Sequence, residues 1–367
     1  MNAAGNGAYT GQRTDYQLLT SDRHVITVGA VGADGKPATY YDQASSTVRR
    51  YSEPGASLFV SAYSGSYVGM EWKGLVTTDR SLDNGYNTSG TDTDIFGQTL
   101  EDTNATPGFN TNFTSTFGGT SAAAATVSGI IAMMLEANPN LTYRDVQHIL
   151  VQSARQNDFA SEEWVTNGGG HAVHHDYGFG IVDARKAVEL ASTWKTVRAE
   201  SSQTTGLITL NRALPDNDLT GIVDTVTLQN QINKIEWAEL TIDFGSGHAD
   251  AGDLEIILTS PLGTEAVFSQ PRADAAGPLG RWTFSTPRFW DEASGGDWTL
   301  TIRDRQTGQT GTLASWELRV RGVANVSGPD LSAVIPNAGS VIIPGSDIDP
   351  FRIAPRELLL RFNEGQQ

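Results

Sequence analysis

One serine in this chain stands where a nucleophile could be presented to a substrate. Ser121 lies in the stretch FGGTSAAAATVSG, between a Gly-Gly-Thr turn and a long apolar run that predicts a helix. The first turn of a helix offers unpaired N–H groups and a positive dipole end, which stabilise a developing oxyanion. The stretch therefore indicates acyl transfer by a serine, although Gly-Thr-Ser is also an ordinary start of a helix.

The segments around Ser121 predict both strands and a helix. Residues 24–31 and 57–62 have the pattern of strands, and residues 80–116 are rich in Asn, Asp, Thr and Gly, which predicts a long surface loop. The helix after Ser121 has little polar face, so we expect it to be buried and to end by Pro139. No apolar run approaches the length of a membrane span.

Two further helices are expected before the pattern changes. Thr142 and Asp145 have the spacing of a capping box, which predicts a helix through about Ser153. Another helix is expected from about Asp183, after the tight turn YGFG. The part of the chain that contains helices is therefore expected to end near Trp194.

After Trp194 the apolar pattern has period two. Apolar and polar residues alternate in 254–259, 298–303 and 316–321, and turn signals such as SPLGT and RQTGQTG lie between the runs. Residues 197–322 therefore predict an all-β sandwich. Residues 323–367 are expected to form a linker and, at ELLLRF, the truncated start of a further domain, for which an Ig-like module is one candidate.

Composition excludes several classes of function. The chain has 367 residues and a formal net charge of −17, which argues against a nucleic-acid partner because phosphate binding needs a basic surface. It has no cysteine, which excludes disulfide scaffolds, thiolate zinc sites and a cysteine nucleophile. The start, MNAAGNGAYTG, has neither the basic nor the apolar region of a signal peptide.

Ordered motifs along the chain resemble one enzyme family. The run GGTSAAAATVSGIIAMMLEANPNLTYRDVQHILVQSA, with AAGNG, YSEPG, VTTD and HDYGFGIVDA, is similar to the catalytic core of subtilisin-like serine proteases of the kexin/furin-like branch. GDLEIILTSPLGT, GDWTLTIRD and SWELRVRG resemble the P domain of proprotein convertases. The resemblance covers about residues 3–322. It implies a partial subtilisin-like α/β domain with a parallel sheet and helices over residues 1–196, followed by a jelly-roll-like sandwich P domain over residues 197–322.

The resemblance implies roles for individual residues. Ser121 matches the nucleophile, and Asn6 matches the asparagine whose side-chain amide completes the oxyanion hole. Ala4 and Gly5 match the backbone that lines one wall of the primary specificity pocket, where substrate binds. Glu53 matches a calcium ligand, with an exposed loop carboxylate as the alternative.

Asp15 matches either a second calcium ligand or an acidic residue of the pocket, because the spacing around it differs from that of the family. The resemblance thus implies structural calcium, polypeptide substrates and a secreted or cell-surface location of bacterial type. It does not give the substrate specificity.

The general base that would activate Ser121 is not evident in this chain. The family carries its Asp and His motifs upstream of the oxyanion-hole asparagine, which here is the sixth residue. None of the six histidines matches the base. His171, His174 and His175 lie close together in the sequence, but no carboxylate or cysteine pattern near them supports a zinc site. The histidines are His24, His148, His171, His174, His175 and His248. We therefore expect the base to lie outside this chain.

Two functions follow from these observations. In the first, the chain is part of a calcium-dependent serine endopeptidase that lacks the N-terminal half of its peptidase domain and is inactive by itself. In the second, it is a non-catalytic binding or scaffold segment. An Asp motif and an HGT histidine encoded in frame upstream of Met1 would separate the two.

Overall fold

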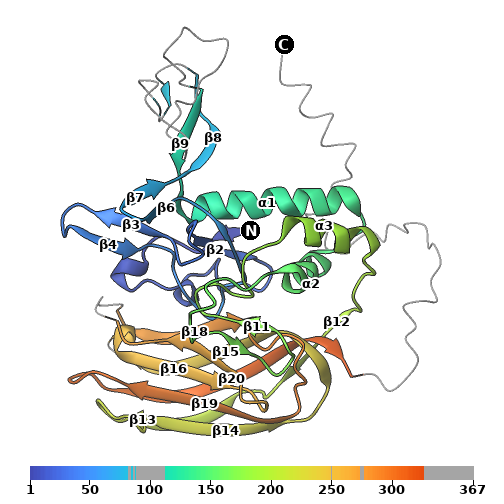
Figure 1. Cartoon of the computed structure of the whole chain (residues 1–367). Coiled ribbons are helices and arrows are strands. Elements are labelled where there is room, and N and C mark those ends of the chain that lie inside the picture. Colours follow the sequence, from blue (N-terminus) through green and yellow to red (C-terminus); the bar gives the residue numbers. More distant parts are fainter. Residues whose placement is uncertain (82–83, 86, 88–111, 249, 273–276, 326–367) are drawn as a thin grey trace, which may run out of the picture.

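The computed structural model describes residues 1–325 except 82–83, 86, 88–111, 249 and 273–276. In it, a unit of short strands and helices lies on one face of a β-sandwich (Figure 1). The last sandwich strand continues to Ala324, and the expected linker and further domain lie almost entirely outside the described residues.

A parallel sheet forms the centre of the first unit. Its strand order is β1 (Asn2–Ala3), β2 (Thr27–Val31) and β5 (Val60–Tyr63). All five residues of β2 are buried, as is usual for a central strand of a parallel sheet. The two strands expected from the sequence are present, but both are shorter and start later than predicted.

Three helices accompany this sheet: α1 (Gly119–Ala137), α2 (Tyr143–Ser153) and α3 (Ala184–Thr193). The predicted capping box of α2 is confirmed, because the Thr142 hydroxyl accepts from the Asp145 N–H and the Asp145 carboxylate accepts from the Thr142 N–H at 2.8 Å. The start predicted for α3 is confirmed as well, since the Asp183 side chain caps it.

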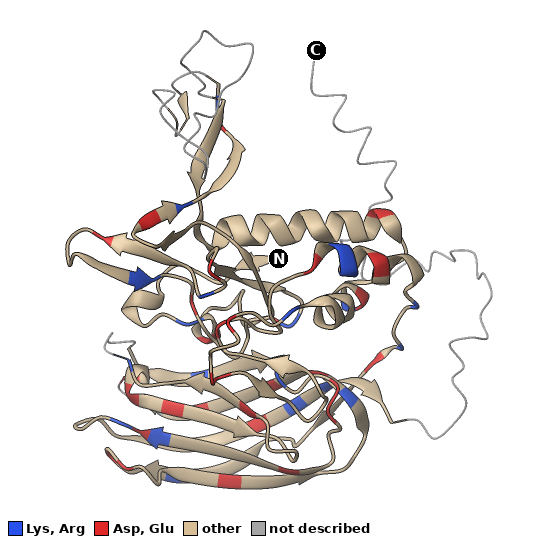
Figure 2. Ribbon diagram, in the orientation of Figure 1, with Lys and Arg blue, Asp and Glu red and all other residues tan. Residues whose placement is uncertain are grey.

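The expectation that α1 is buried on all sides is wrong. It packs against β1, β2, β5 and α3 on one face only, and Met133 and Leu135 on the other face are 45% and 38% exposed. Figure 2 shows no Lys or Arg along it. By length and composition α1 could cross a membrane, but it has the one-sided packing of a core helix whose second face is uncovered in the described part of the chain.

Short antiparallel hairpins and 3-10 turns surround the sheet. The hairpins are β3 (Thr39–Asp42) with β4 (Thr47–Arg50), β6 (Ser66–Val68) with β7 (Glu71–Lys73), β8 (Leu75–Thr78) with β9 (Phe113–Phe117), and β10 (Val165–Thr166) with β11 (Ala172–Val173). The turns are η1 (Ala8–Thr10) and η2 (Thr14–Tyr16). The surface loop predicted for residues 80–116 therefore ends before β9, and most of it lies outside the described residues.

The predicted sandwich is confirmed as two antiparallel sheets. One contains β12 (Glu200–Thr204), β20 (Gly311–Ala324), β15 (Ile232–His248) and β18 (Leu279–Thr286), with β13 (Ile208–Leu214) also paired to β20. The other has the order β14 (Ile222–Leu228), β19 (Gly296–Asp304), β16 (Leu254–Thr259) and β17 (Glu265–Ser269), and the short helix η4 (Ala251–Asp253) leads into β16. Burial alternates along β16, as its sequence predicts.

The two units share a hydrophobic core. Trp237 and Trp290 of the sandwich are 1% exposed and belong to the core cluster of the helical unit. Their rings lie 5.9 Å and 5.7 Å from the ring of Phe59, the residue directly before β5. Since each large aromatic side chain removes substantial apolar area from water, separating the units would expose both tryptophans.

A buried ionic cluster also joins the units. Glu236 of β15 is 1% exposed and accepts from Arg144 Nε at 2.8 Å, from Arg144 Nη2 and from His148 Nε2 at 2.9 Å. Arg144 and His148 both belong to α2. In the described part of the chain, the side chains that bind this carboxylate thus come from the other unit.

Candidate active site

Ser121 is the third residue of α1, at the end of the helix that meets the parallel sheet. Its side chain is exposed and makes no hydrogen bond within the described part of the chain. Its N–H belongs to the first helical turn, where helix geometry supplies no carbonyl partner. The position thus presents both a hydroxyl and a free backbone donor to solvent, as the sequence predicted.

Asn6 is held against the start of this helix by Thr120. The Asn6 Oδ1 atom accepts from the Thr120 N–H and from the Thr120 Oγ1 hydroxyl, both at 2.9 Å. Because these bonds engage the oxygen, the amide Nδ2 is the end of the side chain left to donate. Gly119 has a φ of +81°, and a side chain there would come within 3.4 Å of Asn6 Nδ2. Glycine thus keeps the space beside the amide open.

Glu53 holds the segment that carries Asn6 through a hydrogen bond to its backbone. Glu53 is 1% exposed, and its two carboxylate oxygens accept from the Gly7 N–H at 2.9 Å and the Gln17 Nε2 at 2.7 Å. Gly5 has a φ of +113°, and a Cβ there would lie 2.3 Å from the Glu53 carboxylate. Ala4 is fully buried and donates its N–H to Val28 of β2.

These contacts decide between the alternatives for Glu53. An exposed loop carboxylate is wrong, because the side chain is buried. Burial raises its pKa, and the hydrogen bonds from Gly7 and Gln17 oppose that rise. Within the described residues Glu53 belongs to no group of three possible metal ligands, so its calcium role stays a prediction.

Asp15 has partners that do not fit a calcium ligand. It is fully buried, and its Oδ1 accepts from the N–H groups of Ala56 and Ser57 at 2.8 Å and 3.2 Å. Its Oδ2 faces Arg13 at 3.2 Å, so a guanidinium occupies the place of a metal cation. Burial raises the pKa of Asp15 to about 6, although Arg13 and the two amides oppose the rise. The full burial of Asp15 does not fit an acidic residue of the substrate pocket either.

All six histidines lie in the described residues, and none is a partner of Ser121. His24 lies in a turn rather than on the expected strand and contacts Asp22 at 2.9 Å, whereas His148 is structural on α2 as predicted. The remaining four have other partners: His171 contacts Asp291, His174 contacts Ser161, His175 contacts Val267, and His248 contacts Asp304. The structure therefore places no histidine beside Ser121, and the roles of Ser121 and Asn6 stay predictions.

One histidine, His174, belongs to a group of possible metal ligands that the sequence did not reveal. Possible ligand atoms of Glu163, His174 and Asp176 lie within 4.8 Å of one another. The His174 Nδ1 accepts from the Asp176 N–H at 2.9 Å, so the proton resides on Nε2, which faces the Ser161 hydroxyl. Asp176 in turn pairs with Arg50. These bonds use the His174 and Asp176 atoms that a metal would need.

Two residues that position the site were not assigned from the sequence. Thr120 stands in the quoted GGTS motif, but only the fold shows that it binds Asn6 across the chain. Ser64 donates to the Gly119 carbonyl at 2.7 Å and so holds the start of α1 on the loop after β5. The signal for Thr120 was its place next to the nucleophile, whereas nothing in the sequence pointed to Ser64.

Comparison with known families identifies the class of protein. Residues 1–180 match the subtilase family, and residues 236–320 match the proprotein convertase P-domain. The chain therefore belongs to the kexin/furin-like subtilases that carry a P domain. Members of this family are serine endopeptidases.

Among its relatives are vertebrate convertases. Human proprotein convertase subtilisin/kexin type 7 is 30% identical over 329 residues, which cover 87% of this chain and 37% of that protein. Human furin is 36% identical over 215 residues, which cover 56% of this chain and 26% of that protein. The chain thus spans well under half the length of these relatives.

A solved bacterial structure has the same fold. The serine protease of Aeromonas sobria superposes with a TM-score of 0.68 at 22% sequence identity. The match covers 85% of this chain and 60% of that one. It includes most of both units described above.

Proposed function

We propose that this chain contributes the nucleophile and oxyanion hole of a serine endopeptidase that acts on polypeptides. The observation that carries the proposal is the arrangement at the N-terminus of α1. An exposed, unbonded Ser121 lies next to Thr120, which orients the Asn6 amide through two hydrogen bonds. In this proposal Ser121 attacks the scissile carbonyl, while its N–H and Asn6 Nδ2 donate to the oxyanion.

The base belongs to a segment other than the described one. Every histidine here is engaged away from Ser121, and a serine hydroxyl without a base is a weak nucleophile. A segment that brings a His–Asp pair to Ser121 would complete the triad. Ala4 and Gly5 would line the pocket for the substrate side chain on the acyl side, a position that their closeness to Asn6 supports.

The remaining family properties are proposed on the resemblance alone. We propose that the protein is exported to the cell surface or the medium and acts there on other polypeptides. Its likeness to the convertases and to the bacterial protease supports this proposal. We also propose that calcium stabilises the peptidase unit, with Glu53 as the ligand carried by this chain. If calcium binds there, its chemistry is charge compensation of a buried carboxylate.

The decisive experiment adds the missing segment. The 367-residue chain and the longer polypeptide encoded by the same reading frame, with its upstream codons, are treated with a fluorophosphonate probe and a quenched peptide substrate. We expect labelling and cleavage only in the longer polypeptide, because only it holds a base. Cleavage by the 367-residue chain, or an upstream sequence without His and Asp motifs, would overturn the proposal.

The oxyanion hole gives a graded prediction in the active polypeptide. Asn6→Ala should lower kcat by about 10²–10³ with little change in KM, a range taken from subtilisin, a member of the same family. Thr120→Val keeps the backbone bond to Asn6 but loses the hydroxyl bond, so its loss in kcat should be smaller. Steady-state kinetics on one peptide substrate measures both. A Thr120→Val variant with the wild-type kcat would contradict the positioning role of Thr120.

A further inference from the structure

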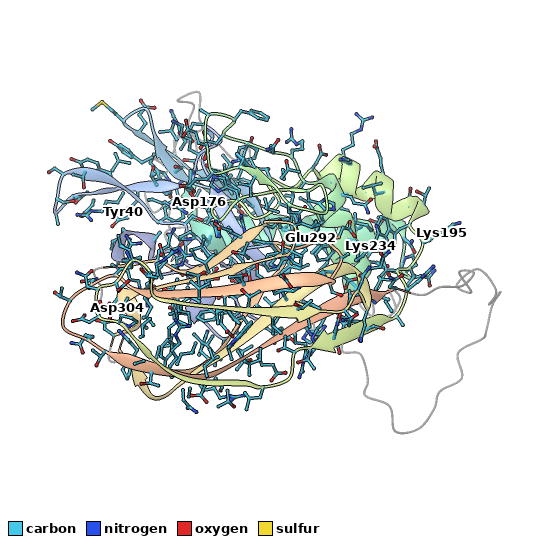
Figure 3. The ribbon with its side chains drawn as sticks, turned by 90° about the horizontal axis from the view of Figure 1, so that it is seen from below. Tyr40, Asp176, Lys195, Lys234, Glu292 and Asp304 are labelled. Atoms are coloured by element: carbon cyan, nitrogen blue, oxygen red, sulfur yellow. The ribbon has the colours of Figure 1, made fainter. Side chains whose placement is uncertain are left out.

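A cavity of about 240 Å³ lies between the helical unit and the sandwich. One wall is the hairpin β10–β11, and the other is the turn between β16 and β17. Glu292 ties the two walls together, because its Oε1 accepts from the Gly168 N–H of the hairpin at 3.0 Å and from the Thr264 hydroxyl of the turn at 2.5 Å. Figure 3 shows Glu292 near the middle of the molecule, whereas Asp304 lies at one end of the sandwich. The cavity thus has two walls that are bonded to each other.

Arg288, just beyond β18, lines this cavity as a buried cation. Its side chain is only 5% exposed, and among the described residues that line the cavity it is the one Lys or Arg. Its Nε donates to the Glu265 carbonyl at 2.9 Å, and its own carbonyl accepts from Asn167 Nδ2 at 2.9 Å. Its Nη1 is buried as well, but no described residue accepts a hydrogen bond from it. A buried charged group that lacks a partner is costly in free energy, so this atom points to a ligand.

The charges around the cavity form two groups. Arg288 is buried, whereas Glu163 and Glu265 line the cavity as exposed side chains. Burial lowers the pKa of Arg288 to about 10, although nearby carboxylates oppose the shift, so the guanidinium is charged at neutral pH. His175 lines the cavity too and is neutral there, because burial lowers its pKa well below the ordinary value. The cavity thus offers one positive charge inside and two negative charges toward solvent.

We propose that this cavity binds a small molecule that carries both a carboxylate and an ammonium group, of which an α-amino acid is the simplest. The carboxylate lies against Arg288, because a planar guanidinium can donate to both oxygens of a carboxylate at once. The ammonium lies toward Glu163 and Glu265, whose charges disfavour a plain anion and disfavour a phosphate more. The volume suits such a molecule, since larger, drug-sized ligands occupy about 300–1,000 Å³. Neither Ser121 nor Asn6 lines the cavity, so the proposal is independent of the peptidase function.

Calorimetry on the 367-residue protein tests the proposal with L-alanine, acetate and ethylammonium as probes. L-alanine carries both groups and should bind saturably. Acetate should bind more weakly, because the two glutamates repel it, and ethylammonium should not bind detectably. Arg288→Met should abolish the binding of L-alanine, since it removes the guanidinium and keeps a long side chain. Because the lost charge has no partner, this variant should still fold, which circular dichroism checks.

Glu163 provides a second variant, on the exposed side of the cavity. Glu163→Gln should weaken the binding of L-alanine by about two- to fivefold, the range of one exposed ion pair, and should strengthen that of acetate. The control is Glu162→Gln, which changes the exposed neighbour that does not line the cavity and should leave both affinities unchanged.

Three results would overturn the proposal. No saturable binding of L-alanine to the wild-type protein, or wild-type affinity in Arg288→Met, would show that Arg288 only holds the Glu265 carbonyl. Equal affinities of the wild-type protein for L-alanine and acetate would show that the ammonium group is not recognised.

Discussion

Replacing Ser121 by alanine should lower kcat by about 10⁶ in the active polypeptide, since loss of the nucleophile in subtilisin costs that much. The oxyanion donors and substrate binding would remain, and these leave about 10³–10⁴ over the uncatalysed rate. The same substitution in the 367-residue chain should change nothing measurable, because no base activates the serine there. Turnover of a peptide substrate and fluorophosphonate labelling measure the two cases.

The control for Ser121→Ala is Ser128→Ala, seven residues further along the same helix. Ser128 is exposed and donates only to the Ala124 carbonyl within α1, so its loss should leave both turnover and labelling intact. Equal labelling of the wild-type and Ser121→Ala polypeptides would mean that another group is the nucleophile. That result would contradict the proposed function even if peptide cleavage persisted.

Glu236→Gln should destabilise the folded chain by about 3–5 kcal/mol, the usual cost of removing one partner from a buried ion pair. The substitution removes the carboxylate that the buried Arg144 guanidinium pairs with and that His148 contacts, at the boundary where both units meet. Urea denaturation followed by tryptophan fluorescence measures the loss, because Trp237 and Trp290 lie in the same boundary.

The matched control is Glu189→Gln on α3. Glu189 pairs with Arg185 one turn away, but both side chains are largely exposed, at 62% and 89%. An exposed pair contributes little to stability, so this variant should unfold at the wild-type urea concentration. Equal losses for Glu236→Gln and Glu189→Gln would mean that the buried cluster does not hold the units together.

The pH dependence of the free energy of unfolding should follow from the lowered pKa of Glu236. Burial raises the pKa of Glu236, but the hydrogen bonds and charges of His148 and Arg144 outweigh it and hold that pKa below its ordinary value. The stabilisation is therefore present above the usual carboxyl pKa and is lost as the pH falls through the lowered value. Glu236→Gln should remove this part of the acid sensitivity.

The sequence was sufficient for the parts of the fold that local chemistry determines. The Thr142 capping box, the start of α3 near Asp183 and the alternation along β16 each depend on a few neighbouring residues, and all were predicted correctly. The exposure of α1 was not, because the composition of a helix says how apolar its surface is and not which elements cover it.

In the candidate site, too, residues in local motifs were predicted, whereas contacts between distant segments were not. Ser121 and Asn6 were found because they stand in motifs with distinctive residues. The anchoring of Asn6 by Thr120, 114 residues away, requires the parallel sheet to bring both segments together. Asp15 and Glu53 were recognised as special carboxylates, but their partners Arg13, Gly7 and Gln17 are contacts that spacing does not reveal.

The shared core limits how this protein could be recombined with others. Trp237 and Trp290 fill space beside Phe59 that the helical unit does not fill with its own side chains. A chimera that joins this helical unit to a foreign sandwich would need indoles at the same two positions and a carboxylate in place of Glu236. Engineers who wish to exchange the sandwich should therefore transplant its whole contact face together with α2, and not cut at the connection near residue 197.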